Sequence, residues 1–293
     1  MKLEQKTEIF RWRPACCLRA SGTDATAFLQ GQFTNDLRAA AGAVYGLWLN
    51  VKGKVIGDSF VVPKGDAYRL ISYESPAEQI RARLDAYIIA DDVTLEDETA
   101  QWGAVTLIGP GIGDEADSWM HSLGGHAFAG RRLAEPHVEC VFPLSRMKEV
   151  EPILASGSAV TAAEIERRRI AAALPAIPRD IGPTDLPNEA GLESVAISYT
   201  KGCYLGQEVM ARLKNLGQVR RKLVPVKSTD AMLPTLPAPL YLEQRPVGEL
   251  RSAIGTEEGV SGLALLSLVH VRGPASLALS PGGATTFQTG DLR

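Results

Sequence analysis

Residues 199–208 read Tyr-Thr-Lys-Gly-Cys-Tyr-Leu-Gly-Gln-Glu, and no other stretch of the chain is as informative. The run places a lysine, a single thiol, two glycines, an amide and a carboxylate next to one another. Such a polar cluster contributes little to a hydrophobic core. It sets Cys203 two positions after a cation, Lys201, and is therefore more typical of a functional site than of a scaffold.

The thiol of Cys203 is the first candidate for chemistry. Lys201 is nearby, and a short helix is predicted to begin near Gly206, so a cation and a helix N-terminus could both favour thiolate over thiol. Each could lower the pKa of a cysteine by about one unit. The alternative is a buried structural cysteine, which is the commoner kind. We expect Cys203 and Lys201 to form the reactive pair.

Length and charge limit the classes of protein to which the chain can belong. With 293 residues, 45% of them hydrophobic, two or three compact units are expected. The net charge of −3 argues against a dedicated nucleic-acid or membrane-surface protein. No bilayer-spanning stretch and no signal peptide are predicted. The four cysteines form no Cys-x-x-Cys pair, which predicts neither a disulfide framework nor a metal site and favours the cytoplasm.

The hydrophobic pattern predicts mixed strands and helices followed by a β-rich tail. Apolar, β-branched runs at 44–49 and 55–62 flank a glycine-containing turn and predict a hairpin. Ser75 and Glu78 are spaced as a capping box at the start of a helix. Short β-type runs within 228–293 predict a small barrel or sandwich.

Five segments resemble, in the expected order, the signature segments of the YgfZ family of folate-binding proteins. The match at Lys201–Glu208 is close and specific, and the other four gain weight from their order. Eukaryotic relatives in this family act in mitochondrial iron–sulfur maturation. The other matching segments are Phe28–Asp36, Leu49–Lys54, Leu186–Leu192 and Gly262–Leu266.

The resemblance implies the α+β fold of the aminomethyltransferase (T-protein) of the glycine-cleavage system, in which three domains surround a central channel that holds tetrahydrofolate. It implies a folate-binding region at 1–227, with two intertwined α+β subdomains, the second inserted around 50–100. A C-terminal β-barrel domain is expected at 228–293. Aminomethyltransferases tend to carry an acidic pair where this chain has Gly57 and Asp58, and the missing acid favours the YgfZ branch.

The resemblance also implies residues that would hold the folate. Glu189 lies where T-proteins place a glutamate that binds the pterin edge through two hydrogen bonds. Asn35 and Asp36 close the N-terminal motif and are expected to face the channel. Each residue also has an alternative, structural interpretation. Glu189 could lie on the surface, Asp36 could cap a turn, the cations could be solvated and the aromatic residues could pack in the core. Cations for the glutamyl tail would be Lys52, Lys54 and Arg212, and walls for the p-aminobenzoyl ring Trp48, Tyr45 and Tyr204.

Three functions follow from this reading. The favoured one is a tetrahydrofolate-binding accessory protein for the synthesis or repair of iron–sulfur enzymes, with Cys203 as the reactive thiol. Its partners would be a folate derivative and client iron–sulfur proteins, with no nucleic acid or membrane, and we expect a monomer. The alternatives are a folate-dependent aminomethyl or one-carbon transferase and an interaction module without a ligand. A maturation factor is favoured over an enzyme.

Overall fold

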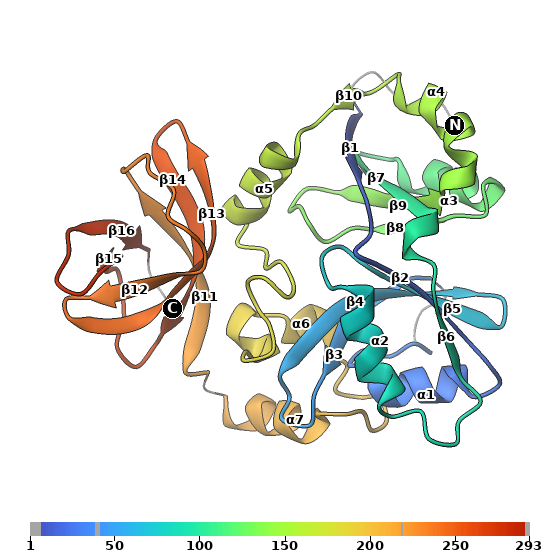
Figure 1. The fold of residues 1–293 in the computed structure, drawn as a ribbon, viewed down its shortest axis with the longest axis horizontal. Helices are drawn as coiled ribbons and strands as arrows, with labels where there is room; N and C mark the ends of the chain where they lie inside the picture. Colours follow the sequence, from blue (N-terminus) through green and yellow to red (C-terminus); the bar gives the residue numbers. More distant parts are fainter. Residues whose placement is uncertain (1–6, 39–41, 218, 291–293) are drawn as a thin grey trace.

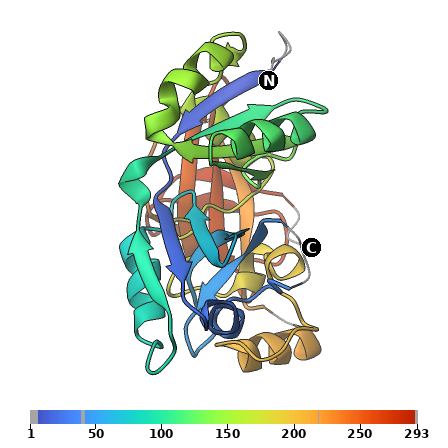
Figure 2. The same ribbon diagram turned by 90° about the vertical axis from the view of Figure 1, so that its right-hand side faces the viewer.

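A computed structural model describes residues 7–38, 42–217 and 219–290. These residues form two five-stranded sheets and a closed barrel, joined by a connector that carries short helices (Figure 1). The view turned by 90° shows the barrel behind the two sheets (Figure 2). The α+β class with a C-terminal β-barrel, expected from the sequence, is confirmed.

The first sheet has the strand order β3-β4-β5-β2-β6. Successive side chains of a strand point to opposite faces, and both faces of this sheet are buried. Cys16 and Leu18 of β2 pack under α1 and α2, whereas Cys17 between them faces the second sheet. The bounds are β2 Cys16–Ser21, α1 Ala25–Gln32, β3 Val44–Leu49, β4 Val55–Lys64, β5 Ala67–Ser72, α2 Ala77–Asp85 and β6 Thr94–Asp97.

The second sheet has the strand order β10-β1-β7-β9-β8. Because β1 precedes β2 in the chain, the whole first sheet is inserted between β1 and its antiparallel neighbour β7. The two sheets pack face to face, with the rings of Phe60 and Phe128 4.5 Å apart, and α3 and α4 cover the outer face. The bounds are β1 Glu8–Trp12, η1 Thr99–Gln101, β7 Trp102–Ile108, α3 Gly113–Ser122, β8 His126–Ala129, β9 His137–Pro143, η2 Leu144–Arg146, α4 Met147–Leu154 and β10 Ser158–Ala159.

The barrel has the strand order β11-β14-β13-β12-β15-β16 and closes where β11 pairs with β16. Alternation along β11 places Val224 and Val226 inside the barrel, while Leu223 joins the apolar cluster outside it. The bounds are β11 Arg221–Ser228, β12 Ala238–Leu242, β13 Arg245–Thr256, β14 Gly259–Ser267, β15 Ser276–Ala278 and β16 Thr285–Thr289. The division at 227/228 expected from the sequence remains a proposal about how the chain separates into folding units.

The connector between the second sheet and the barrel is held by one apolar cluster. This cluster contains Ile170, Ile177 and Met210 of the connector, Leu49 of the first sheet and Leu265 of the barrel. The connector therefore packs on both the first sheet and the barrel. Its helices are α5 Ala162–Ala171, η3 Pro187–Ala190, α6 Glu193–Ala196 and α7 Gln207–Leu216.

One local prediction, the capping box at Ser75, is wrong. Helix α2 begins at Ala77 after Pro76, and no side chain caps it. The hydroxyl of Ser75 instead donates to Asp58 on β4 at 2.6 Å. A long-range partner therefore replaces the local capping interaction. The predicted hairpin is confirmed by β3 and β4.

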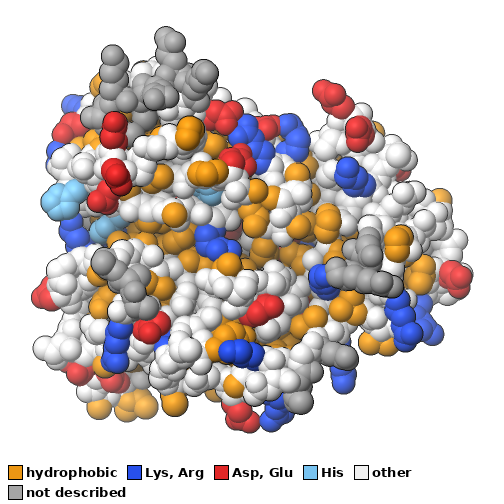
Figure 3. Space-filling model, turned by 180° about the vertical axis from the view of Figure 1, so that it is seen from behind, with side chains coloured by type: hydrophobic (Ala, Val, Ile, Leu, Met, Phe, Trp, Pro, Cys, Tyr) orange, Lys and Arg blue, Asp and Glu red, His pale blue; other side chains and the backbone are white. Residues whose placement is uncertain are grey.

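The surface carries charges of both signs. On the face shown in Figure 3, acidic and basic side chains are interspersed, and hydrophobic side chains lie in a band across the middle. None of the helices in the described part of the chain is long and apolar enough to cross a bilayer.

Candidate functional site

The thiol of Cys203 is exposed on the loop that leads into α7. Cys16, Cys17 and Cys140 are buried, and burial raises the pKa of each of these three thiols well above its ordinary value. Cys203 is therefore the cysteine that a partner or reagent can reach. This accessibility agrees with the functional reading of the motif and rules out the structural alternative, a buried cysteine.

Lys201 anchors the thiol loop to the loop that follows α1. Its ammonium group donates to the backbone carbonyls of Gln30 and Phe33 at 2.7 Å and to that of Asn35 at 2.8 Å. Burial lowers the pKa of Lys201 to about 8, so the ammonium form prevails at pH 7. Its donors are directed at these carbonyls, not at the thiol, and we therefore assign Lys201 a positioning role.

Further hydrogen bonds join the same two segments. The amide of Leu205 donates to the carbonyl of Gly31 at 3.1 Å, and the amide of Ser198 donates to that of Thr34 at 3.0 Å. The hydroxyl of Thr34 donates in turn to the carbonyl of Ala196 at 2.6 Å. Both views place α1 and α7 at the same end of the molecule (Figures 1 and 2). The N-terminal motif is thus the support of the cysteine motif.

The tip of the β3–β4 hairpin packs against the start of α7. Gly206 has a φ of +86°, and a Cβ atom there would lie 2.9 Å from the carbonyl oxygen of Asn50. Gly53 has a φ of +69°, and a Cβ atom there would lie 2.9 Å from the side chain of Met210. Glycine is favoured at both positions because φ is positive and a Cβ atom would crowd a neighbouring group. Three of the sequence motifs therefore meet around Cys203.

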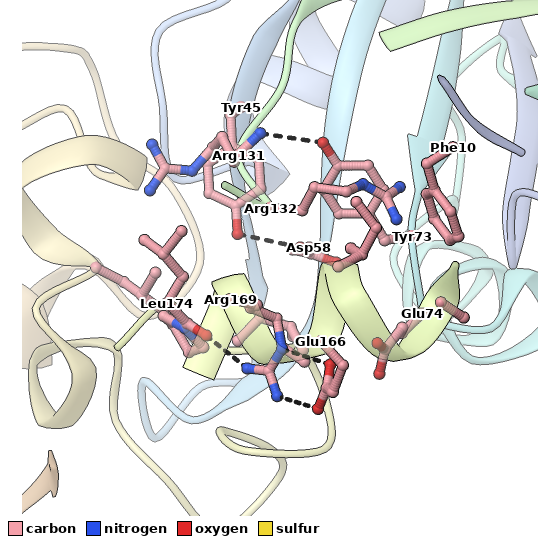
Figure 4. Close-up of a pocket in the computed structure, with 16 residues that line it drawn as sticks. Phe10, Tyr45, Asp58, Tyr73, Glu74, Arg131, Arg132, Glu166, Arg169 and Leu174 are labelled. Carbon is pink, nitrogen blue, oxygen red and sulfur yellow. Dashed lines mark hydrogen bonds and ion pairs between the residues drawn. The ribbon is translucent and has the colours of Figure 1, made fainter. Parts of the chain in front are cut away.

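A cavity of about 170 Å³ lies between the two sheets, α5 and the connector. Aromatic rings and charged groups line it together (Figure 4). A cavity of about 150 Å³ accepts benzene, so this volume has room for a small flat ring system. The lining residues that matter below are Phe10, Tyr45, Asp58, Tyr73, Arg131 and Arg132.

Asp58 is the buried carboxyl group of this cavity. It lies on β4 two residues before Phe60 and therefore points to the same face, towards the second sheet. Its oxygens accept hydrogen bonds from the hydroxyls of Tyr45 at 3.0 Å and of Ser72 and Ser75 at 2.6 Å each. Desolvation raises the pKa of Asp58, and the three hydroxyl donors oppose that shift.

Gly57, beside Asp58, is tightly packed, so that a larger residue there would require its neighbours to shift. A Cβ atom at position 57 would lie 3.1 Å from the Cβ atom of Ser75 and 3.3 Å from the side chain of Ile80. Packing under α2 therefore disfavours a second acid beside Asp58.

Replacement of Asp58 by asparagine is expected to stabilise the protein increasingly as pH rises. When folding raises the pKa of an acid, the folded protein loses stability as the pH rises. The loss begins near the pKa of the unfolded state, about 3.8, and is complete above the pKa of the folded state. Asparagine carries no charge and avoids this loss. Melting temperatures of Asp58→Asn and wild type should be measured between pH 4 and pH 8. The melting temperature of the variant should exceed that of wild type by an amount that grows as the pH rises. A difference independent of pH would contradict the assignment.

Arginines of the cavity wall bind the surrounding elements together. Arg169 of α5 donates to Asp180 at 2.7 Å, to Glu166 at 2.7 Å and to Ser252 of the barrel at 2.8 Å. Arg132 donates to the buried carboxylate of Glu139 at 3.0 Å. These pairs fix the shape of the cavity.

Most of the expected folate-binding residues lie away from this cavity, and Tyr45 lines it. The carboxylate of Glu189 is buried and accepts from Arg221 at 2.8 and 2.9 Å, so both of its oxygens are engaged. Asp36 caps a turn by accepting from the amide of Arg38, and this bond, followed by one from Gln30, lowers the pKa of Asp36.

The remaining expected residues have structural or surface positions. The amide group of Asn35 donates to the carbonyl of Tyr45 at 2.9 Å. Trp48 is fully buried and donates to Ser59 at 2.9 Å, and Tyr204 packs in the apolar cluster of the connector. Lys52 is exposed at the hairpin tip and Lys54 is half-buried beside it, while Arg212 is exposed and pairs with Glu208 on α7. None of these residues lines the cavity.

Two parts of the chain match known domain families. Residues 5–125 match the GCVT N-terminal domain, and residues 220–288 match the C-terminal β-barrel domain of CAF17. The chain is 29% identical to the human mitochondrial iron–sulfur cluster assembly factor IBA57, over 93% of this chain and 81% of that protein. It is 28% identical to the tRNA-modifying protein YgfZ of Edwardsiella ictaluri, over 76% of this chain and 71% of that protein. The chain is similar to the IBA57 and YgfZ proteins over most of its length.

The fold of this chain is that of a T-protein. The aminomethyltransferase T of the glycine cleavage system from Bartonella henselae superposes with a TM-score of 0.76 at 17% identity, covering 99% of this chain and 86% of that one. The expected three-part arrangement around a central cavity is therefore confirmed at the level of the fold.

The cavity has room for one flat ring system of the kind a folate carries, and not for a folate's tail as well. Its volume of about 170 Å³ and its Tyr45 and Tyr73 walls suit one flat ring system. Nη2 of Arg132 is buried without a hydrogen-bond partner. The anionic tail would have to leave through the mouth of the cavity.

The sequence motifs did not predict that Asp58 lies in the cavity as its buried acid. They also did not single out Arg131 and Arg132, which line the cavity as well. The period-two alternation of β4 could have placed Asp58 with Phe60 on an inner face. The arginine pair lies in irregular chain between β8 and β9, where no sequence pattern predicts orientation.

Proposed function

We propose that this protein binds a reduced folate in the cavity and supports the synthesis or repair of iron–sulfur enzymes through the thiol of Cys203. The observation that carries the proposal is the exposed Cys203 on a loop whose neighbouring lysine is fully used as an anchor. A thiol held in this way is available to a partner while the loop around it stays ordered. The printed names of the IBA57 and YgfZ relatives supply the choice of client class.

The chemistry proposed for Cys203 is ligation. Its thiol loses a proton to solvent, and the resulting thiolate donates an electron pair to an iron atom of a cluster that is in transit or under repair. Thiolate is the form of cysteine that binds metals. Among the described residues, no group of three or more His, Cys, Asp or Glu side chains is arranged to hold a metal ion. The partner would therefore supply the other ligands, and the contact would be reversible.

The cavity would hold the pterin ring, with Tyr45 and Tyr73 against its faces and Asp58 and Arg132 at its polar edge. A bound tetrahydrofolate supplies a carrier of one-carbon units. The cytoplasmic location expected from the cysteines belongs to this proposal, although the IBA57 relatives are named as mitochondrial.

Complementation tests the proposal. A bacterial strain lacking its own gene of this family should regain the activity of an enzyme that contains a [4Fe–4S] cluster when the wild-type chain is expressed. The enzyme's protein level, measured by immunoblot, separates loss of the cluster from loss of the protein. Unchanged, low activity despite soluble expression would contradict a role in maturation.

A one-carbon transferase is the second candidate, and the position of Asp58 in the cavity favours it. Incubation of the purified protein with tetrahydrofolate should then yield the methylene form of the folate and ammonia from an aminomethyl donor, or the methyl form from a methyl donor, with loss of product in Asp58→Asn. Folate binding without turnover would leave the maturation factor as the better account.

Absence of any heat on calorimetric titration with folate would favour an interaction module without a ligand.

A further inference from the structure

Arg83 of α2 is a buried arginine without an acid partner. It is 9% exposed, and no carboxylate of the described residues forms an ion pair with it. Burial lowers the pKa of its guanidinium to about 10, so the group remains charged at neutral pH. Burying a charge without an opposite charge costs free energy. Such costly charges are concentrated at functional sites, so the groups that Arg83 binds are of interest for function.

The guanidinium of Arg83 joins two segments that are distant in the sequence. Nε donates to the backbone carbonyl of Leu49 at 2.7 Å, and Nη1 donates to the side-chain oxygen of Gln32 at 2.7 Å. The guanidinium also lies 4.7 Å above the ring of Tyr87, which limits its freedom to turn. Leu49 is the last residue of β3 and Gln32 the last residue of α1. Arg83 therefore ties the end of β3 to the end of α1.

The α1 end of this bridge supports the thiol loop. The carbonyl of Gly31, next to Gln32, accepts a hydrogen bond from the amide of Leu205 at 3.1 Å. Lys201 donates to two further carbonyls of the same turn at 2.7 Å each. Two buried cations, Arg83 and Lys201, thus hold the same short stretch of chain, one through a side chain and the other through the main chain.

The hairpin end of the bridge touches the thiol loop as well. A Cβ atom at Gly206 would lie 2.9 Å from the carbonyl oxygen of Asn50 and 3.2 Å from the Cβ atom of Leu49. Gly206 precedes the first turn of α7 and lies three residues after Cys203. Because no free space separates the two segments, a shift at the end of β3 would displace the chain that carries the thiol.

We infer that Arg83 is a positioning residue for the thiol of Cys203. By holding the end of α1 to the end of β3, it sets the distance between the two supports on which the thiol loop rests. Lys201 binds the loop to one of these supports, and Arg83 binds the supports to each other. The inference rests on the proposed function of Cys203 and adds to that site a residue of α2 that no motif of the sequence includes.

The shape of the guanidinium matters to this role. A planar guanidinium presents its donors as a fixed fork and reaches two acceptors at once, whereas the ammonium group of lysine is a compact point charge. Lysine at position 83 would keep the positive charge and could keep one of the two hydrogen bonds. Replacement by methionine would remove both hydrogen bonds and the charge. The two replacements together separate the geometry of the bridge from its charge.

Spin labelling of Cys203 in the full chain tests the inference. The other three cysteines are buried, so a thiol-specific nitroxide reagent should label Cys203 selectively. Electron paramagnetic resonance then reports the mobility of the loop at a temperature well below the melting temperature. The spectrum of Arg83→Met should shift towards higher mobility than that of wild type. Arg81→Met removes an exposed arginine from the same helix and should leave the spectrum unchanged.

Arg83→Lys supplies the second measurement and decides the matter if Arg83→Met does not fold. Its label mobility should lie between those of wild type and Arg83→Met, because one of the two supports loses its hydrogen bond. A wild-type spectrum in Arg83→Lys would overturn the role of the fork. A lower melting temperature with an unchanged spectrum in Arg83→Met would show that the arginine only stabilises the fold, and would overturn the inference.

A functional readout completes the test. In a complemented null strain, Arg83→Met should support a cluster-containing enzyme less well than Arg81→Met at equal levels of the two proteins. Equal support by both variants would overturn the importance of Arg83 for the site. Labelling requires neither iron nor folate. Failure of wild type to support the enzyme would therefore overturn the proposed function, while the spectra would still decide whether Arg83 positions the thiol.

Discussion

Replacement of Cys203 by serine is expected to abolish the support of iron–sulfur enzymes in cells and to leave the fold unchanged. The side chain is exposed, and no contact of the described structure depends on its sulfur. Serine has nearly the same shape but is a far weaker ligand for iron, because its hydroxyl stays protonated near neutral pH. Loss of the thiolate should therefore remove function almost completely, with a change in unfolding free energy within about 0.5 kcal/mol.

The measurement is activity of a cluster-containing enzyme in a complemented null strain, paired with thermal unfolding of the purified variant. Cys140→Ser provides the contrast, since that thiol is buried. It should lower the melting temperature, and the protein that remains folded should still function. Full complementation by Cys203→Ser would show that the thiol has no part in the activity.

Replacement of Lys201 by methionine is expected to destabilise the protein by about 3 kcal/mol or more. The change removes the donor for three carbonyl oxygens, and a buried acceptor left without a partner costs about 1–3 kcal/mol. Methionine preserves the length and apolar character of the stem, so that the loss reports the ammonium group. Chemical denaturation followed by circular dichroism should show an earlier midpoint.

Lys52→Met is the control for this change. Lys52 lies exposed at the hairpin tip, and its removal should alter the unfolding free energy by no more than about 0.5 kcal/mol. If Lys201→Met had the same denaturation midpoint as wild type but failed to complement, Lys201 would act on the thiol of Cys203 and would not anchor the loop. An earlier midpoint with the control unchanged is the result expected of an anchor.

The part of the fold that follows from local pattern was predictable from the sequence. The β3–β4 hairpin, the start of α7 after Gly206 and the β-rich tail all depend on turn residues and period-two alternation. The cap at Ser75 failed because a carboxylate on a neighbouring strand, Asp58, competes for its hydroxyl. No pattern within a few residues of Ser75 contains that information.

The candidate site was predictable only where its residues are contiguous. Cys203 lies within one motif, and its exposure agrees with the reading of that motif. The role of Lys201 depends on the path of the chain near Phe33, and Glu189 meets its partner Arg221 only when the barrel is in place. Arg131 enters the cavity from an irregular segment. Such contacts are set by tertiary packing.

The anchor of the thiol loop has a consequence for the divergence of relatives. Lys201 binds main-chain oxygens, which every amino acid provides, so substitutions at Gln30, Phe33 and Asn35 need not disturb it as long as the chain keeps its course. Selection at this place should therefore act on backbone geometry and on a single lysine. Distant homologues can therefore differ at many side chains of this loop and still hold the sulfur of the cysteine in the same position and orientation.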